Sequence, residues 1–182
     1  VPRMSSIAVL SARYLHARLK NYFPTLPANT SSVPRMHEFI LTLSEEDFSN
    51  LEGVGIPKSQ AIPQVGKLFL DFGFHAPTGA FPEVFGLMIE PTESYTKSEL
   101  DRFADAVITI KEIISECPEA FKTAPHFTPI DRVDEVGANR NLTLFERLDH
   151  LPSLHINRIH PSTLNQLQVS EIKNRILERI KV

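Results

Sequence analysis

The stretch LFLDFGFHAPTGAFPEVFGLMIEPTES, residues 68–94, contains the signals that decide the fold. It starts at the end of an amphipathic helical pattern, where Gly73 can adopt the left-handed conformation that reverses the chain after a helix. Pro77 pushes Ala76 toward extended geometry and has no amide donor, so the piece FHAPT, which holds His75, predicts an edge strand. The apolar run GLMIE, residues 86–90, predicts a strand that is covered on both faces.

The residues before this stretch predict two helices, a strand and a loop. Apolar residues recur at helical spacing from Ser6 to about Lys20. The segment HEFILTL, residues 37–43, is apolar and rich in β-branched and aromatic residues, which predicts a strand. The next segment, SEEDFSNLEGVGIPKS, is rich in turn residues and predicts a mobile loop. Ser59 is the expected N-cap of a second helix, which ends near Asp71.

The residues after the stretch predict a long helix, a tail and a last helix. Thr96 and Glu99 have the spacing of a capping box, and the helical pattern that follows them stops at Cys117 before Pro118. The next residues, to about 145, contain prolines and show no sustained period, so we expect an irregular tail docked on the surface. The segment VSEIKNRILERIKV predicts a helix with one apolar stripe, formed by Ile172, Ile176 and Ile180.

This order of elements predicts an α+β domain. Its sheet is expected to be short and largely antiparallel, with helices packed on one face, followed by the irregular tail and the C-terminal helix. A chain of 182 residues, 42% of them hydrophobic, is long enough for one domain with its own core.

Composition excludes several classes of protein. A net charge of −3 gives no electrostatic footprint for nucleic acid or for an anionic membrane. The single cysteine, Cys117, excludes an internal disulfide framework and favours a reducing compartment, for which the cytoplasm is the default. We find no apolar run of the ~20 residues that a spanning helix needs, and no secretory signal. Because the sequence begins with Val1 rather than Met and a helical pattern starts only a few residues later, we interpret it as a fragment or a processed piece.

The usual motifs of metal and nucleophilic chemistry are missing. His150, His155 and His160 recur every five residues, a spacing that does not place ligands on one helical face, so no metal site is predicted. Cys117 adjoins a proline at a helix end, and no serine lies in a Gly-x-Ser-x-Gly turn. Neither EGVG nor FGLM has the glycine spacing of a phosphate-binding loop.

Four polar residues near the decisive stretch remain as candidates: His75, Thr78, Glu90 and Glu93. The two glutamates precede the long helix, where a negative charge favours the positive end of the helix dipole, and we interpret them mainly in that way. A histidine such as His75 on a short strand is more often structural than catalytic. Spacing alone therefore predicts an α+β domain and assigns no activity.

Several segments together resemble a known family. MHEFIL, LFLDFGFHAPT, FPEVFGLMIEPTES, KSELDRFADAVITIKE, TAPH and DRVDEVGANRNL are similar to the C-terminal region of the glycine cleavage system P-protein, glycine dehydrogenase (decarboxylating). The resemblance is dense from residue 6 to 116, shortened from 121 to 145, and missing from 146 to 182. It divides the chain into a P-protein-like domain (1–120), a docked tail (121–145) and an extension with the C-terminal helix (146–182).

The resemblance implies the small C-terminal domain of a type I enzyme dependent on pyridoxal phosphate. Such an enzyme decarboxylates glycine and passes the aminomethyl group to the lipoyl arm of the H-protein, and the intact enzyme is expected to be a dimer. In the family, the lysine that holds the cofactor follows a histidine and precedes a glycine-rich stretch. None of the eight lysines here has that context, so this chain is not expected to bind the cofactor or to be active alone.

The resemblance also implies where site residues lie. His75 and Thr78 are expected to face the active-site cleft, where they could bind the substrate or line the lipoyl path. His37 and Glu38 are further candidates, and Arg35 before them could bind an anion. Two alternatives stay open: a non-enzymatic interaction module derived from this domain, and the small domain of another type I enzyme, such as an aminotransferase or a relative of the cysteine desulfurases.

Overall fold

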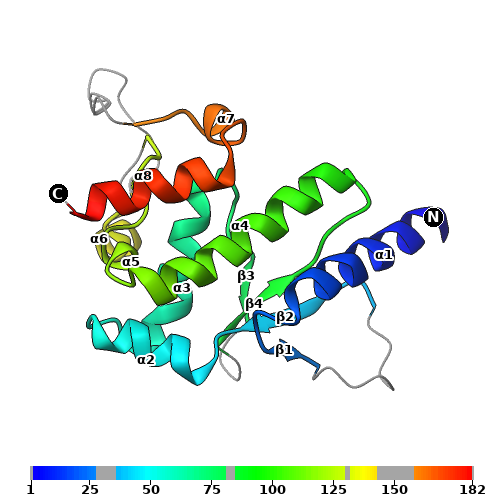
Figure 1. The fold of residues 1–182 in the computed structure, drawn as a ribbon, viewed down its shortest axis with the longest axis horizontal. Helices are drawn as coiled ribbons and strands as arrows, with labels where there is room; N and C mark the ends of the chain where they lie inside the picture. Colours follow the sequence, from blue (N-terminus) through cyan, green and yellow to red (C-terminus); the bar gives the residue numbers. More distant parts are fainter. Residues whose placement is uncertain (1, 28–35, 81–84, 130–131, 143–157, 182) are drawn as a thin grey trace.

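The computed structural model describes residues 2–27, 36–80, 85–129, 132–142 and 158–181 (Figure 1). It is an α+β fold, as predicted, with a four-stranded sheet in the order β1-β2-β4-β3. The strands are β1 (Thr25–Leu26), β2 (Phe39–Thr42), β3 (Thr78–Ala80) and β4 (Gly86–Ile89). All three strand pairs are antiparallel, which confirms the expected sheet type.

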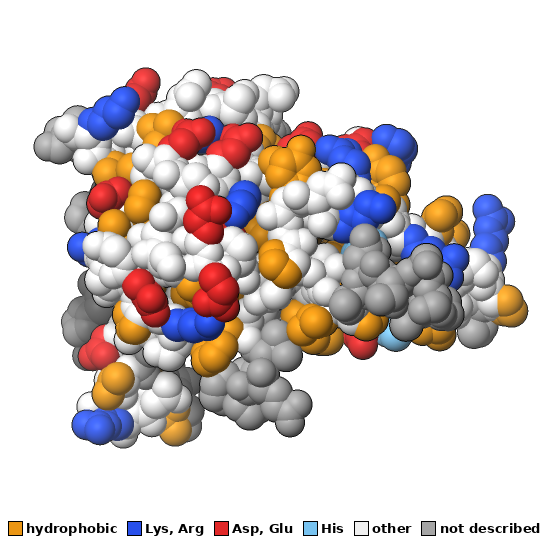
Figure 2. All heavy atoms as spheres, turned by 60° about the horizontal axis from the view of Figure 1, so that its bottom comes forward, with side chains coloured by type: hydrophobic (Ala, Val, Ile, Leu, Met, Phe, Trp, Pro, Cys, Tyr) orange, Lys and Arg blue, Asp and Glu red, His pale blue; other side chains and the backbone are white. Residues whose placement is uncertain are grey.

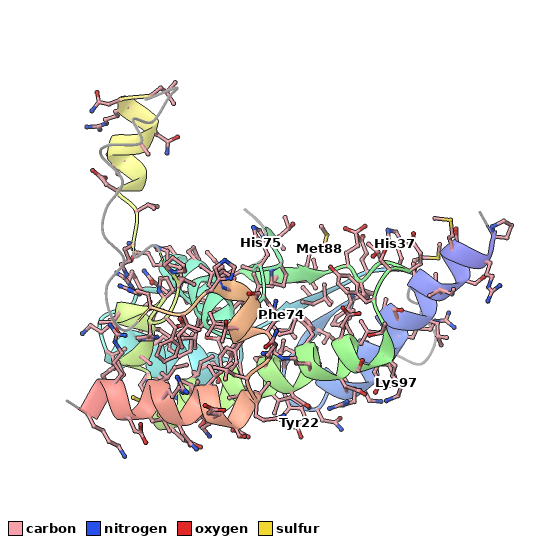
Figure 3. All side chains as sticks on the ribbon, turned by 90° about the horizontal axis from the view of Figure 1, so that it is seen from above. Tyr22, His37, Phe74, His75, Met88 and Lys97 are labelled. Atoms are coloured by element: carbon pink, nitrogen blue, oxygen red, sulfur yellow. The ribbon has the colours of Figure 1, made fainter. Side chains whose placement is uncertain are left out.

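The two faces of this sheet differ in burial. Phe39, Leu41, Leu87 and Ile89 point to one face and are buried, because helices α1 (Pro2–Leu19) and α4 (Lys97–Glu116) pack there (Figure 3). The opposite face, which contains Ile40, Thr42, Met88 and Thr78, is half-buried or exposed, and we refer to it as the open sheet face. Helices on one face were predicted, whereas the prediction that β4 is covered on both faces is wrong at Met88.

Helix α4 confirms the strongest expectation from the sequence. The side chain of Thr96 caps its N-terminus, and the carboxylate of Glu99 accepts a hydrogen bond from the backbone amide of Thr96, as the capping box predicts. The helix ends with Cys117 as its C-cap. Its buried stripe lies at the centre of the core, between α1, α3 and the C-terminal helix (Figure 1).

The predicted mobile loop after β2 is wrong. Residues Glu45–Gly53 form helix α2, with Ser44 as N-cap and a capping box completed by Asp47. The carboxylate of Asp47 is fully buried and forms an ion pair with Lys111 of α4, so the helix is fixed to the core through its first turn. The many turn residues of the segment favoured a loop, and the capping box was not recognised because it has an aspartate where glutamate is usual.

The decisive stretch folds largely as expected. Helix α3 (Lys58–Asp71) has Pro57 as its N-cap, so the prediction of Ser59 as the cap is wrong, and Ser59 lies within the first turn. Gly73 has a φ of 79°. Strand β3 is an edge strand, but it begins only at Thr78. His75 therefore lies in the connection before the strand and not within it.

The chain after Pro118 does not simply wrap the surface. Helix α5 (Ala120–Thr123) inserts Phe121, which has no exposed surface, into the core. Buried His126 donates its backbone amide to Asp71 at 2.7 Å, and its ring Nδ1 lies 2.7 Å from the other oxygen of that carboxylate. The tail was expected to be irregular and docked, but its residues Glu135–Arg140 form helix α6, which stands away from the body (Figure 3).

The C-terminal helix is confirmed and belongs to the same core. Helices α7 (Pro161–Leu164) and α8 (Val169–Lys181) follow each other along one side of α4 (Figure 1). Ile172 and Ile176 are fully buried, and Lys173 of α8 lies 2.8 Å from Glu112 and 2.9 Å from Glu116 of α4.

The surface charges and the helices of the described residues agree with two expectations from the composition. Figure 2 shows acidic and basic side chains interspersed over the face that it draws. Among the described residues, no helix is both long and apolar enough to cross a membrane.

Candidate functional site

A pocket of about 650 Å³ opens beside the edge of the sheet. Three parts of the fold enclose it: the connection from Gly73 to Thr78, the end of β4, and the first turns of α4. His75 and Thr78, the first two candidates, both line it. Met88, Leu100 and Phe103 supply apolar lining, and Asn165, the C-cap of α7 (Pro161–Leu164), contributes from the C-terminal part of the chain. We call this the His75 pocket.

The conformation of His75 follows from the local backbone. Gly73 reverses the chain after α3, and the side chain of His75 is exposed at the pocket. Its Nδ1 lies 2.9 Å from the carbonyl oxygen of Ala76. Because a carbonyl only accepts, Nδ1 carries the proton, and Nε2 of the neutral ring is left as an acceptor.

The second pair of candidates lies close to the first on the open sheet face. Phe39 pairs with Ile89, so the residues just outside them, Glu38 and Glu90, end neighbouring strands. Nε2 of His37 is 3.5 Å from Oε1 of Glu90, and one ligand atom each of His37, Glu38 and Glu90 lie within 4.8 Å of one another. All three side chains are exposed, and an exposed cluster of this kind is not by itself a metal site.

Glu90 connects the two groups of candidates. It lines the His75 pocket and also contacts His37. In Figure 3, His75, Met88 and His37 follow one another along the same side of the sheet, away from Lys97. The structure therefore brings four predicted residues, His37, Glu38, His75 and Thr78, to one continuous surface. Arg35, the predicted anion ligand, lies outside the described residues.

Glu90 and Glu93 were expected to act mainly at the start of the long helix. The acid that caps α4 is Glu99, whose carboxylate accepts from the Thr96 backbone amide at 2.7 Å. This bond, together with one from the Thr96 hydroxyl, holds the pKa of Glu99 below its ordinary value. Glu90 lies instead at the end of β4, beside His37.

Arg102 is a site residue that the sequence did not reveal. It extends from α4 into the lining of the His75 pocket, and its guanidinium stacks over the ring of Phe74 at 5.0 Å. Nη1 donates to the carbonyl oxygen of Phe72, and Nη2 donates to that of Leu164, both at 2.8 Å. Burial lowers the pKa of Arg102 from its ordinary value. The sequence carries no signal for these contacts, because their partners are backbone carbonyls of distant segments.

Two other buried groups were also missed or weakly signalled. The Asp71–His126 pair joins α3 to the segment TAPH, which appeared in the sequence only as part of the family resemblance. Cys117 is half-buried, and burial raises the pKa of its thiol. A raised pKa disfavours the thiolate, which agrees with the absence of a nucleophilic motif around this residue.

The comparison with known families decides the relationship. The family described as "Glycine dehydrogenase, C-terminal domain" matches residues 4–126. The chain belongs to this family. The match includes β1 to β4, α2 to α5, all of α1 but its first two residues, and Arg102, whereas Asn165 lies outside it.

Curated relatives of this glycine dehydrogenase domain support the same assignment. The chain is 42% identical over 141 residues to "Probable glycine dehydrogenase (decarboxylating) subunit 2" of Caldanaerobacter subterraneus subsp. tengcongensis, with 76% of the chain and 26% of that relative covered. The relative of the same name from Aquifex aeolicus is 42% identical over 146 residues, with 79% and 28% covered. The mitochondrial "Glycine dehydrogenase (decarboxylating)" of Pisum sativum is 41% identical over 130 residues, with 67% and 11% covered. The chain thus matches only a minor part of each relative's length.

The residues present do not fit the anchoring of an aldehyde cofactor. The residues that line the His75 pocket include no lysine among those that the structure describes. Four lysines of this glycine dehydrogenase domain contact carboxylates elsewhere: Lys58, Lys97, Lys111 and Lys173. An amine is required for the covalent attachment of pyridoxal phosphate. The described lining of the pocket therefore offers no amine for that attachment.

Proposed function

We propose that this chain is the small C-terminal domain of a pyridoxal-phosphate-dependent glycine dehydrogenase (decarboxylating), the P-protein of the glycine cleavage system. In this proposal the His75 pocket and the open sheet face form one wall of the active-site cleft. The carrying observation is that His37, Glu38 and Glu90 cluster where β2 begins and β4 ends, and that Glu90 lines the same pocket as His75 and Thr78. The family assignment gives this surface its context.

The cofactor lysine belongs, in this proposal, to the remainder of the protein. Pyridoxal phosphate supplies the electron sink that decarboxylation needs when it is bound there. The residues of this chain orient and enclose the substrate. Nε2 of His75 accepts a hydrogen bond from a bound ammonium or water, and the Thr78 hydroxyl offers a second polar contact. Met88 and Phe103 exclude water from that side.

The proposal also names partners and a location. The apolar part of the pocket lining, which includes Met88, Leu100 and Phe103, suits a hydrocarbon arm that ends in a small ring, such as the lipoyl group of the H-protein. The large cofactor domain is the second partner, and the intact enzyme is proposed to be a dimer in the cytoplasm. The partnership with the H-protein is the most direct to test, because it predicts that the reaction rate saturates with the concentration of the lipoylated carrier.

The test is the substitution His75→Asn in the intact enzyme. We expect the exchange of labelled bicarbonate into glycine to fall by about 10-fold or more, because the ring acceptor at the pocket is lost. Affinity for the lipoylated carrier is measured in parallel. Glu178→Gln, on the exposed side of α8, is the control and should leave both unchanged. Unchanged exchange and unchanged carrier affinity in His75→Asn would refute the assignment of this wall.

The alternatives make different predictions. An interaction module predicts that the gene upstream of this sequence encodes no histidine–lysine pair followed by glycines, and that the protein does not exchange bicarbonate with glycine. The small domain of another type I enzyme predicts turnover of a different amino acid by the intact protein. Assaying the intact protein with glycine and a panel of other amino acids separates the three.

A further inference from the structure

We propose that Arg102 and Asn165 are positioning residues, through which the C-terminal segment α7–α8 holds the Gly73–Thr78 connection and sets the place of His75. The segment lies beyond the residues that match the glycine dehydrogenase family, 4–126. The role in positioning rests on the geometry alone, and its effect on turnover rests on the proposed function.

Arg102 joins three backbone carbonyls from two segments at one guanidinium. Nη1 donates to the carbonyl of Phe72 at 2.8 Å, immediately before Gly73. Nη2 donates to the carbonyls of Leu164 at 2.8 Å and Leu167 at 3.3 Å, on either side of the turn after α7. These bonds are charge-assisted, and the planar fork fixes the angle between the segments. A single side chain of α4 therefore ties the end of α3 to α7.

Asn165 makes a second, steric connection at the same place. A Cβ on Gly73 would lie 2.2 Å from Oδ1 of Asn165 and 3.0 Å from its backbone nitrogen. The side chain of Asn165 thus occupies the space beside Gly73, and it also lines the His75 pocket. Because His75 follows Gly73 by two residues, a shift of Gly73 would carry the imidazole with it.

The C-terminal segment is itself firmly held. Leu164, Ile172 and Ile176 have no exposed surface, and Lys173 bridges to two glutamates of α4. The carbonyl of Phe127 accepts from the amide of Ile159 at 2.7 Å, so the segment is also tied at its start. A rigid α7 can therefore determine the position of the connection that it touches.

The experiment uses the intact enzyme with the variants Arg102→Met, Arg102→Lys and Asn165→Ala. Arg175→Met is the matched control, because Arg175 forms an exposed ion pair with Glu171 on α8. The first measurement is hydrogen–deuterium exchange of the peptides that contain residues 73–78, compared with those of β2 and α4. The second is the separate determination of kcat and KM for glycine exchange, with kcat normalised to the concentration of folded enzyme, because partial unfolding would itself lower the apparent kcat without changing KM.

We expect Arg102→Met and Asn165→Ala to raise the exchange rate of residues 74–76 by about 5-fold or more, while β2 and α4 keep their protection. Arg102→Lys should behave like Arg102→Met, since one ammonium cannot span the carbonyls of both segments. In all three variants kcat should fall by about 10-fold with little change in KM, because the imidazole is displaced but not removed. The control should change neither quantity.

Two outcomes overturn the proposal: unchanged exchange at residues 73–78 in both Arg102→Met and Asn165→Ala, or exchange that rises equally in β2 and α4. If Arg102→Met does not fold, Asn165→Ala and Arg102→Lys decide. Faster local hydrogen exchange in the variants of a protein whose wild type shows no glycine activity would support the positioning role and refute the proposed function, so the two failures are distinguishable.

Discussion

Gly73 shows how one residue can serve both the fold and the site. Its φ of 79° lies in the left-handed region, which other residues enter only at a cost. The same residue faces Asn165, which leaves no room for a methyl group. The backbone requirement was predictable from the sequence, because a glycine after a helix is a common C-terminal signal. The steric requirement was not, because Asn165 is far away along the chain.

The substitution Gly73→Ala, compared with a substitution at a glycine that has only the backbone requirement, measures the two requirements separately. We expect it to lower the free energy of unfolding by about 2–4 kcal/mol, as left-handed strain and the clash with Asn165 add together. Gly55→Ala is the matched control, since Gly55 has a φ of 87° but a methyl group there would meet no heavy atom within 4 Å. It should cost only about 1–2 kcal/mol. Urea unfolding measures the free energy of unfolding of both variants. Equal losses would show that the side chain of Asn165 moves aside without cost.

At the scale of single elements, the N-terminus of α4 is stabilised by a carboxylate with a lowered pKa. Glu99 accepts from the backbone amide and the hydroxyl of Thr96. A lowered pKa in the folded state means that the unfolded state takes up the proton first. This contribution to stability is therefore complete above the ordinary glutamate pKa of 4.5 and is lost as the pH falls through the lower folded value.

The variant Glu99→Gln tests this linkage. We expect its free energy of unfolding to depend less steeply on pH below 4.5 than that of the wild type, because the titrating group is gone. Unfolding in urea at pH 3.5, 4.5 and 6 gives the slopes. Glu178→Gln on exposed α8 should keep the wild-type slope. A wild-type slope in Glu99→Gln would contradict the assigned role of the cap.

The sequence revealed elements better than it revealed contacts between them. The capping box of α4 was recognised, but the similar Ser44 and Asp47 pattern of α2 was not, because glycines and a proline nearby indicated a loop. The core position of Phe121 was missed for the same reason. His75 and Thr78 were expected at a site only through the family resemblance, and both line the His75 pocket. Arg102 bonds to backbone carbonyls, and the side chain of Asn165 lies against Gly73. Neither kind of contact leaves a periodic pattern or a motif in the sequence.

At the scale of the whole molecule, the C-terminal helix completes the core of the domain. Helix α8 covers α4 on the side opposite to the sheet-bound α1 (Figure 1). Ile172 and Ile176 are fully buried there, while Ile180 is only partly buried at the end of the same stripe. The segment from 158 to 181 is thus part of one packed body with the family domain.

The pair Ile176→Ala and Ile180→Ala tests this integration. Ile176→Ala should lower the free energy of unfolding by about 2–4 kcal/mol, through lost apolar burial and the cavity that remains. Ile180→Ala should cost about 1 kcal/mol, since its side chain is already partly exposed. Both are measured by urea unfolding of the same preparation. Equal, small effects would show that α8 does not share the cooperative unit.

The long separations between paired residues have a consequence for kinetics. The Asp71–His126 pair spans 55 positions, Lys173–Glu112 spans 61, and Arg102–Leu167 spans 65. Each requires a large loop to close before the contact forms, and such closure is what slows a chain in its search for the native topology. Refolding from denaturant should accordingly be slower than in a helical bundle of equal length, where most partners are near neighbours.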